Sequence, residues 1–226
     1  MGCFGGKVNR AFHLPSGEQV ELERSVEAPG LAEGVLVGPT GRWVLPATEP
    51  MDRPEELEAI APWITDGERV LVATPNGLVL REPGGEVHIG GSPTPWRQPA
   101  LGEGFVAWIE DEVVMLLEDG RGIVEWAPGR HVAAQDRIVA WIDDERVCVQ
   151  KLGEMKQCTW TDAHTSRALT LDDGVACWES WNGADVDVEC SDGFRVGGDG
   201  HQRAPSRDNG RVLYRDGETV RVVSVE

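Results

Sequence analysis

The chain lacks long apolar runs. None of its hydrophobic stretches approaches the roughly 18–20 residues of a membrane-spanning helix, so we expect no membrane span. No basic segment followed by an apolar one opens the sequence, so no signal peptide is predicted and a cytoplasmic location is the default expectation. If Met1-Gly2 were a cloning remnant, Cys3 could be the lipidated first residue of a mature lipoprotein, which would indicate the cell envelope instead.

Positive charge is also scarce. Lys and Arg total 21 against 39 Asp and Glu, which gives a formal net charge of −18. Such a charge repels phosphate backbones, so we expect no nucleic-acid partner. Most of the acidic residues are expected to coat solvated hairpin turns, and an acidic cleft for a basic ligand is the alternative interpretation.

Sequence patterns that carry catalysis or metal binding are missing as well. There is no G-x-S-x-G nucleophile motif, and the acidic turns lack the spacing of an EF-hand. His131, His164 and His201 each fall just before a predicted strand, where we expect ordinary loop residues, and a three-histidine metal site is the alternative. We therefore nominate no catalytic residue, no metal ligand and no cofactor.

Cysteine is rare and has no metal-site spacing. The five cysteines are Cys3, Cys148, Cys158, Cys177 and Cys190, and none belongs to a C-x-x-C pair. The last four flank two successive predicted hairpins. A turn at Asn182-Gly183 would place Cys177 opposite Val188 and Cys190 diagonal to it, at about 7–8 Å between Cα atoms. Because that is at or beyond the disulfide limit of about 7 Å, we predict free, half-buried thiols and keep cross-strand disulfides as the alternative.

The sequence does contain a repeated motif. FVAWIEDE at 105–112 returns as IVAWIDDE at 138–145, and in weaker form as VACWE at 175–179 and RVLYR at 211–215. The aromatic steps are 141 − 108 = 33, 178 − 141 = 37 and 214 − 178 = 36 residues. A period in the mid-thirties, made of short alternating strands and tight turns, predicts a β-propeller.

The predicted architecture is all-β, a six-bladed propeller in which residues 1–226 form a single domain. Hairpin signals such as Pro75-Asn76-Gly77 separate alternating strands. The predicted repeats are approximately 28–60, 62–95, 97–127, 130–161, 165–198 and 202–226. The last repeat has only three strands, so we expect a hairpin in 1–27 to complete it and to close the ring without open edges. That hairpin offers two strands where one is needed, so a propeller of seven blades is an alternative. A propeller of five blades is a further alternative.

One repeat resembles a known family. The segment from Trp178 to Val188, WESWNGADVDV, is similar to the TolB-like propeller repeat, in which a V-x-W strand is followed by an acidic or Asn-Gly turn and a D-I-Y type strand. Residues 106–108 and 139–141 match the same first strand, and the resemblance covers roughly 62–226. It implies a propeller of the TolB-like or WD-like kind. Members of that family include periplasmic and surface binding proteins.

Tryptophan is abundant, with nine residues. Trp108, Trp141 and Trp178 share one repeat position, so we expect them to pack between neighbouring blades. Trp63, Trp96 and Trp181 depart from that register, and the first two lie on or beside innermost strands, which line the axial channel of a propeller. Such residues suit stacking on a sugar or capping a peptide, and packing at blade edges is the alternative. The candidate ligand-binding residues are Trp63, Trp96, Gln98, Gln135, Arg167, Trp181 and Arg203.

These observations favour a non-catalytic binding or scaffold propeller that holds a protein segment or a small ligand at a channel mouth. A propeller-type lyase or hydrolase acting on a glycan or peptide is one alternative. It would require histidines and carboxylates gathered at one mouth. A cell-envelope lipoprotein sensor is the other alternative, and it differs in location more than in chemistry.

Overall fold

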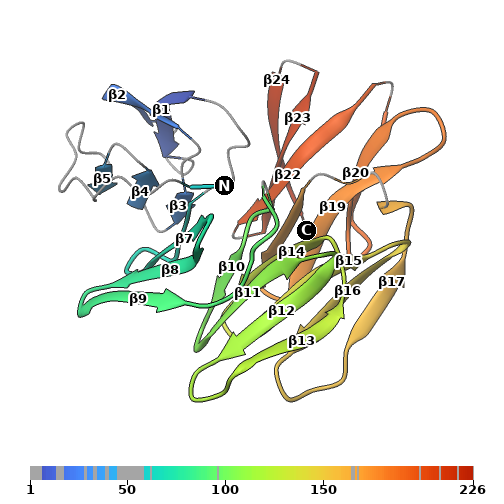
Figure 1. Ribbon diagram of the computed structural model, residues 1–226. Coiled ribbons are helices and arrows are strands. Elements are labelled where there is room, and N and C mark those ends of the chain that lie inside the picture. Colours follow the sequence, from blue (N-terminus) through green and yellow to red (C-terminus); the bar gives the residue numbers. More distant parts are fainter. Residues whose placement is uncertain are drawn as a thin grey trace. The chain divides into compact units, whose positions relative to one another are not determined.

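The computed structural model describes residues 7–13, 18–27, 30–32, 35–38, 41–44, 59–61, 63–95, 97–163, 166, 168–198, 200–208, 210–217 and 219–225. These segments form strands joined by short connections (Figure 1). Within them no helix is long and apolar enough to cross a membrane. The chain divides into two compact units, Met1–Pro99 and Ala100–Glu226, which are described separately.

In the first unit the described strands form antiparallel sheets in sequence order. Strand β1 (Lys7–His13) pairs with β2 (Glu18–Glu27); β3 (Gly30–Ala32), β4 (Val35–Gly38) and β5 (Gly41–Val44) form a second sheet; β6 (Ile64–Thr65), β7 (Val70–Thr74), β8 (Gly77–Glu82) and β9 (Gly85–Ile89) form a third. The hairpin predicted around Asn76 is confirmed, with Thr74 opposite Gly77. Gly77 has a φ of +119°, and a Cβ there would lie 2.8 Å from the Ile89 carbonyl oxygen, so the turn requires glycine.

The second unit repeats a four-stranded antiparallel meander. Its sheets are β10 (Ala100–Gly102), β11 (Phe105–Glu110), β12 (Val113–Glu118), β13 (Ile123–Pro128); β14 (His131–Gln135), β15 (Ile138–Asp143), β16 (Arg146–Lys151), β17 (Gln157–Trp160); β18 (Leu169–Asp172), β19 (Val175–Trp181), β20 (Val186–Cys190), β21 (Arg195–Val196); and β22 (Gln202–Asp208), β23 (Arg211–Asp216), β24 (Thr219–Ser224). The first strands of successive sheets lie side by side, β10 beside β14, β14 beside β18 and β18 beside β22 (Figure 1). This radial stacking of meanders is the arrangement of propeller blades.

The repeated tryptophans occupy the core, as expected. Trp108, Trp141 and Trp178 lie at the same position of the second strand of their sheets and are at most 1% exposed. Trp141 packs in a cluster with Ile109 and Val114 of the preceding sheet. Trp178 likewise packs with residues of β15 and β16. Packing between neighbouring sheets is therefore confirmed for Trp141 and Trp178. The physical cause is the two-residue period of a strand, which directs alternate side chains toward the sheets on either side.

The prediction of free thiols is wrong. Within the described residues, disulfides join Cys148 to Cys158 and Cys177 to Cys190, each with a Cα–Cα distance of 4.0 Å. Each pair is directly opposed across two strands.

For Cys177 and Cys190 the error lies in the length of one turn. The β19–β20 connection is a four-residue loop, with Trp181 opposite Val186, and not a two-residue turn at Asn182-Gly183. The Asn182 side-chain oxygen accepts hydrogen bonds from the N–H groups of Ala184 and Asp185 at 2.9 Å and stabilises this longer loop. Two extra residues shift the partner of Cys177 from Val188 to Cys190.

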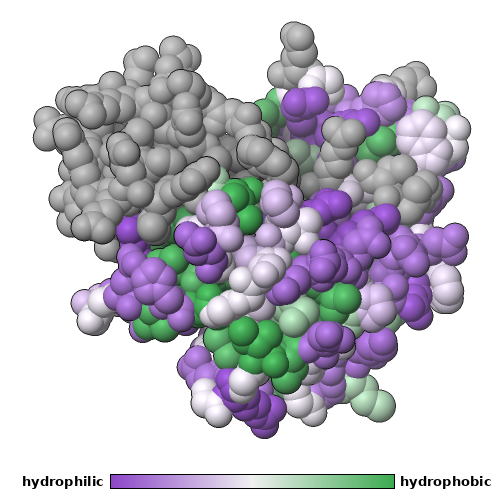
Figure 2. Space-filling model, viewed as in Figure 1, coloured by the Kyte–Doolittle hydropathy of each residue, from purple (hydrophilic) through white to green (hydrophobic). Residues whose placement is uncertain are grey.

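The acidic hairpin tips are exposed, as predicted. Asp111 and Glu112 form the β11–β12 turn, and Asp144 and Glu145 form the β15–β16 turn. Asp111, Glu112 and Asp144 have φ values between 46° and 63°, the left-handed region that two-residue hairpin turns use. Figure 2 shows polar residues over much of the visible face of the second unit, with an apolar patch over the sheet β10–β13.

The strands of the second unit, apart from the last residue of β13 (Pro128), lie within the residue ranges of the last four predicted repeats, and the bounds of those repeats stay predictions. The three-stranded sheet β22–β24 corresponds to the predicted incomplete repeat at 202–226. The count of six blades, the closure of the ring by the N-terminal hairpin and the single domain over 1–226 stay predictions.

Candidate binding surface

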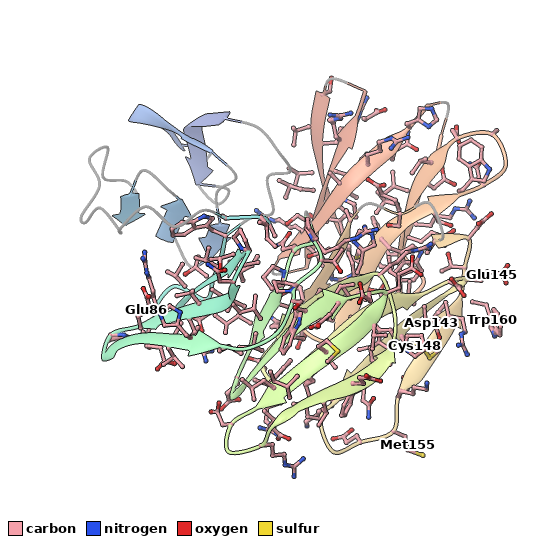
Figure 3. The ribbon with its side chains drawn as sticks, viewed as in Figure 1. Glu86, Asp143, Glu145, Cys148, Met155 and Trp160 are labelled. Atoms are coloured by element: carbon pink, nitrogen blue, oxygen red, sulfur yellow. A yellow bond between two sulfur atoms is a disulfide. The ribbon has the colours of Figure 1, made fainter. Side chains whose placement is uncertain are left out.

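An exposed tryptophan marks the end of an outer strand in the second unit. Trp160 is the last residue of β17, and 72% of it is exposed. It lies opposite Arg146, the first residue of β16, and therefore beside the acidic turn Asp144-Glu145. Figure 3 shows Asp143, Glu145 and Trp160 close together, with Met155 at the other end of the strand. We call the set Asp143, Asp144, Glu145, Arg146 and Trp160 the Trp160 edge.

Charges on the Trp160 edge are only partly paired. The Arg146 guanidinium lies 5.3 Å from the centre of the Trp160 ring and forms an ion pair with the Asp143 carboxylate. Asp144 and Glu145 are exposed. Three carboxylates and one guanidinium (−3 + 1) give these five residues a charge of −2, and the Arg130 guanidinium, which donates to the Asp144 carbonyl, reduces the local excess to −1. It thus combines a large apolar ring with excess negative charge, an arrangement that favours cations over anions.

A hydrogen-bond network holds the chain immediately after Trp160. The Thr161 N–H donates to the Glu145 carbonyl at 2.8 Å, and the Thr161 hydroxyl donates to Glu189 Oε2 at 3.0 Å. The buried indole N–H of Trp178 donates to the same hydroxyl at 2.9 Å. Arg130 donates from one nitrogen to the carbonyls of Asp144, at 3.0 Å, and Ala163, at 2.8 Å. The exposed ring of Trp160 therefore projects from a well-fastened backbone.

A stacked aromatic pair, Trp181 and His201, is connected to the segment that follows Trp160. The Trp181 N–H donates to the Asp162 carbonyl at 3.0 Å, which links Trp181 to the segment that follows Trp160. The Trp181 ring stacks on His201, with ring centres 6.5 Å apart and 23° between planes. His201 Nδ1 accepts the Val186 N–H at 3.1 Å, so the ring is oriented by the backbone.

Buried carboxylates support the loops around Trp181. Asp187 is 1% exposed and accepts from Asn182 at 3.0 Å and from Arg195, whose hydrogen bond to Asp187 raises the pKa of the guanidinium. Buried Glu179 accepts the Ala204 N–H at 2.9 Å. These contacts join the β19–β20 hairpin to β21 and β22, so they fix loop positions.

The predicted site residues have different surroundings. Trp63 is 1% exposed and packs with Val70 and Val72, with the Arg81 guanidinium 5.9 Å from its ring centre. Its burial favours the packing alternative over ligand contact. The amide of Gln135 is engaged by the β18–β19 turn, donating to Asp172 at 3.2 Å and accepting the Asp173 N–H at 2.5 Å.

The remaining predicted residues divide between described and undescribed parts of the chain. Gln98, Trp181 and Arg203 are half-buried. Trp96 and Arg167 lie outside the described residues. Trp160 was missed because it lies outside the repeated V-x-W position. The available signal was a tryptophan in a polar predicted outer strand, followed by Thr161-Asp162.

Metal ligation has no described candidate. In the parts of the chain that the structure describes, no three His, Cys, Asp or Glu side chains are grouped so that they could hold a metal ion.

Comparisons with known proteins show the fold. No protein-family model matches the chain, and no curated protein matches it. Among solved structures, the β-propeller domain of Cps50 (Swd1) from Myceliophteria thermophila has a TM-score of 0.64 at 10% identity, covering 100% of this chain and 92% of its own. The WD40 ectodomain of the Arabidopsis thaliana receptor kinase ACR4 has a TM-score of 0.57 at 11% identity, covering 92% and 83%.

A bacterial structure is similar to a comparable degree. BamB from Moraxella catarrhalis has a TM-score of 0.56 at 13% identity, covering 100% of this chain and 78% of its own. At such low identities the similarity concerns the fold alone. The chain has a β-propeller fold, and the narrower TolB-like assignment stays a prediction.

Proposed function

We propose that this chain is a non-catalytic scaffold that holds a segment of a partner protein. The observation that carries the proposal is Trp160, a ring that is 72% exposed on a strand end fixed by Thr161 and a disulfide. Tryptophan is enriched among the residues that contribute most of the binding energy at protein interfaces. Because the backbone that carries the ring is already fastened, binding costs little backbone entropy at this position.

The wider binding surface proposed from the sequence complements this anchor. Trp181 lies beyond the same hydrogen-bond network, and its ring is partly exposed. We propose that Trp181 and Arg203 add contacts at a channel mouth, in a propeller whose blades are of the TolB-like kind. Propeller folds suit this role, because their loops present many side chains from one rigid core.

Capture of partners by the immobilised chain tests the proposal. Wild-type protein, Trp160→Ala and Met155→Ala are compared as baits in extracts of the encoding organism, with bound proteins quantified by mass spectrometry. Met155 is the matched control because it is 91% exposed and lies in the loop between β16 and β17, the strand that carries Trp160. We expect specific proteins retained by wild type and Met155→Ala and lost with Trp160→Ala. Equal retention by all three would refute a binding role for Trp160.

We also propose that the protein resides in an oxidising compartment, because it contains two disulfides. Disulfides persist in extracytoplasmic compartments and are rare in the cytosol. Cys148–Cys158 and Cys177–Cys190 therefore support the envelope sensor alternative over a cytoplasmic protein. Acid trapping of cells followed by thiol alkylation tests this: oxidised cysteines are expected, and four reduced thiols in the native cell would exclude it. No comparable observation favours the lyase or hydrolase alternative.

A further inference from the structure

We infer that the segment held at the Trp160 edge is a basic, extended polypeptide that adds to β17 as a further strand. This inference rests on the proposed function and specifies the chemistry of its partner. It is carried by the open edge of β17, by the direction of its backbone groups and by the charge next to Trp160.

The outer edge of β17 has backbone groups that pair with no other described strand. No described strand pairs with β17 on the side away from β16. In an antiparallel pair, hydrogen-bonded and non-hydrogen-bonded positions alternate. The Thr161 N–H bonds to the Glu145 carbonyl, so the Arg146–Trp160 and Cys148–Cys158 pairs are non-hydrogen-bonded. The N–H and C=O groups of Cys158 and Trp160 therefore point toward the open edge, as strand addition requires.

Side-chain geometry then sets what the added strand carries. Residues 158 and 160 project from the same face of the sheet, and Arg146 lies beside Trp160 on that face. A residue of the added strand directly opposite Trp160 would have its Cβ about 4.5–5.5 Å away, on the side of the indole remote from Arg146. A Lys or Arg there would stack on the second face of the ring.

The charge of the edge selects the sign of the partner. The exposed carboxylates of Asp144 and Glu145 lie in the turn that precedes β16, the strand that pairs with β17. Arg146 is paired with Asp143, and Arg130, which donates to the Asp144 carbonyl, offsets one of the two charges and leaves an excess of −1. The whole chain carries a net charge of −18, which attracts a basic segment and repels an acidic one during encounter.

Other exposed apolar positions lack this combination. Ile123 and Val124 on β13, and Val220 and Val222 on β24, are 40–66% exposed aliphatic residues. Among the described residues, Trp160 is the one exposed large aromatic side chain. Its neighbouring carboxylates give the β17 edge a chemical preference that aliphatic patches do not have.

Synthetic peptides test the inference directly. The full-length, oxidised protein is titrated against a fluorescent peptide of about ten residues that alternates Lys or Arg with Thr or Val, a β-favouring composition. Two further probes are a charge-reversed peptide with Glu at the basic positions and a basic peptide N-methylated at alternate residues. N-methylation removes the donors that strand addition uses and leaves the charge unchanged.

We expect the basic peptide to bind and both other peptides to bind at least about tenfold more weakly. Trp160→Ala should weaken binding of the basic peptide at least about tenfold, and Asp144→Asn/Glu145→Gln about three- to tenfold. Met155→Ala should bind as wild type does. Raising the salt concentration from about 50 to about 200 mM should weaken wild-type binding more than that of the double variant.

Four results would overturn the inference: no binding of the basic peptide, equal binding of the acidic peptide, equal binding of the N-methylated peptide, or unchanged affinity in Trp160→Ala. If Trp160-dependent partners are nevertheless captured from extracts, the scaffold function stands and only the basic-strand chemistry fails. Circular dichroism of each variant verifies its fold; Trp160, Asp144 and Glu145 are exposed, so these substitutions leave the core intact.

Discussion

Two tryptophans at equivalent positions of successive sheets differ in one hydrogen bond, which gives a matched experiment. The buried indole N–H of Trp178 donates to the Thr161 hydroxyl at 2.9 Å. The indole N–H of Trp141 is also buried, and it has no hydrogen-bond partner among the described residues. Both rings are 1% exposed. Replacing each with Phe removes the same atoms from a similar environment but ends a hydrogen bond only at Trp178.

The magnitudes follow from the two surroundings. Both substitutions lose similar packing, so the packing terms largely cancel in the comparison. Trp178→Phe also loses a hydrogen bond, about 1 kcal/mol, whereas Trp141→Phe removes an unsatisfied buried donor and recovers about 1 kcal/mol or more. Trp178→Phe should therefore be less stable than Trp141→Phe by about 2 kcal/mol in the free energy of unfolding.

Urea denaturation followed by far-ultraviolet circular dichroism measures the difference. With an m-value of about 3 kcal/mol/M, a 2 kcal/mol difference separates the unfolding midpoints by about 0.7 M. Thr161→Val should cost less in the Trp178→Phe background than in wild type, because the shared bond is already gone. Equal midpoints for the two Phe variants, or a lower midpoint for Trp141→Phe, would refute the hydrogen-bond reasoning.

Further predictions concern the disulfides, a glycine and a surface carboxylate. Under mild reduction of the native protein, the β16–β17 disulfide should open first, because Cys158 is partly exposed while both cysteines of the β19–β20 disulfide are buried. Alkylation followed by mass spectrometry measures the order of opening, and simultaneous opening would contradict this prediction. Gly102→Ala should lower the free energy of unfolding by about 1–3 kcal/mol, because the added Cβ would lie 2.1 Å from a ring carbon of Phe105. The control is Gly122→Ala, whose Cβ would meet no atom within 4 Å and which should unfold like wild type in the same urea assay. A hydrogen bond from Arg137 lowers the pKa of Glu118, so this carboxylate stabilises the fold above its unfolded pKa and ceases to do so as pH falls through the folded value. Glu118→Gln should accordingly be less stable than wild type near pH 7 and equal to it near pH 2; a difference that persists in acid would disprove the linkage.

Much of the fold could be predicted because its signals are local. The repeat of Trp108, Trp141 and Trp178 follows from the two-residue period of strands and from blades of similar length, so residue spacing alone indicates which rings share a position. The acidic tips, such as Asp144-Glu145, were predictable for the same reason, because turn chemistry depends on adjacent residues.

The Cys177–Cys190 disulfide could not be predicted, because the length of one loop decides the register of an entire hairpin. The side-chain bonds of Asn182 make the β19–β20 loop four residues long, and the sequence offers an equally plausible two-residue turn at the same place. A shift of two residues keeps every side chain on its face, so hydrophobic alternation cannot reveal it.

The sequence alone determined the repeat, the strands and the excess negative charge, since each depends on neighbouring residues or on simple sums. Only the tertiary structure decided which tryptophans are accessible. Trp63 and Trp160 both depart from the repeated position, yet one is 1% exposed and the other 72%. Trp63 packs against Val70 and Val72, whereas Trp160 ends an outer strand whose far edge has no paired strand among the described residues. Exposure depends on what the rest of the chain places against a side chain, which no local pattern encodes.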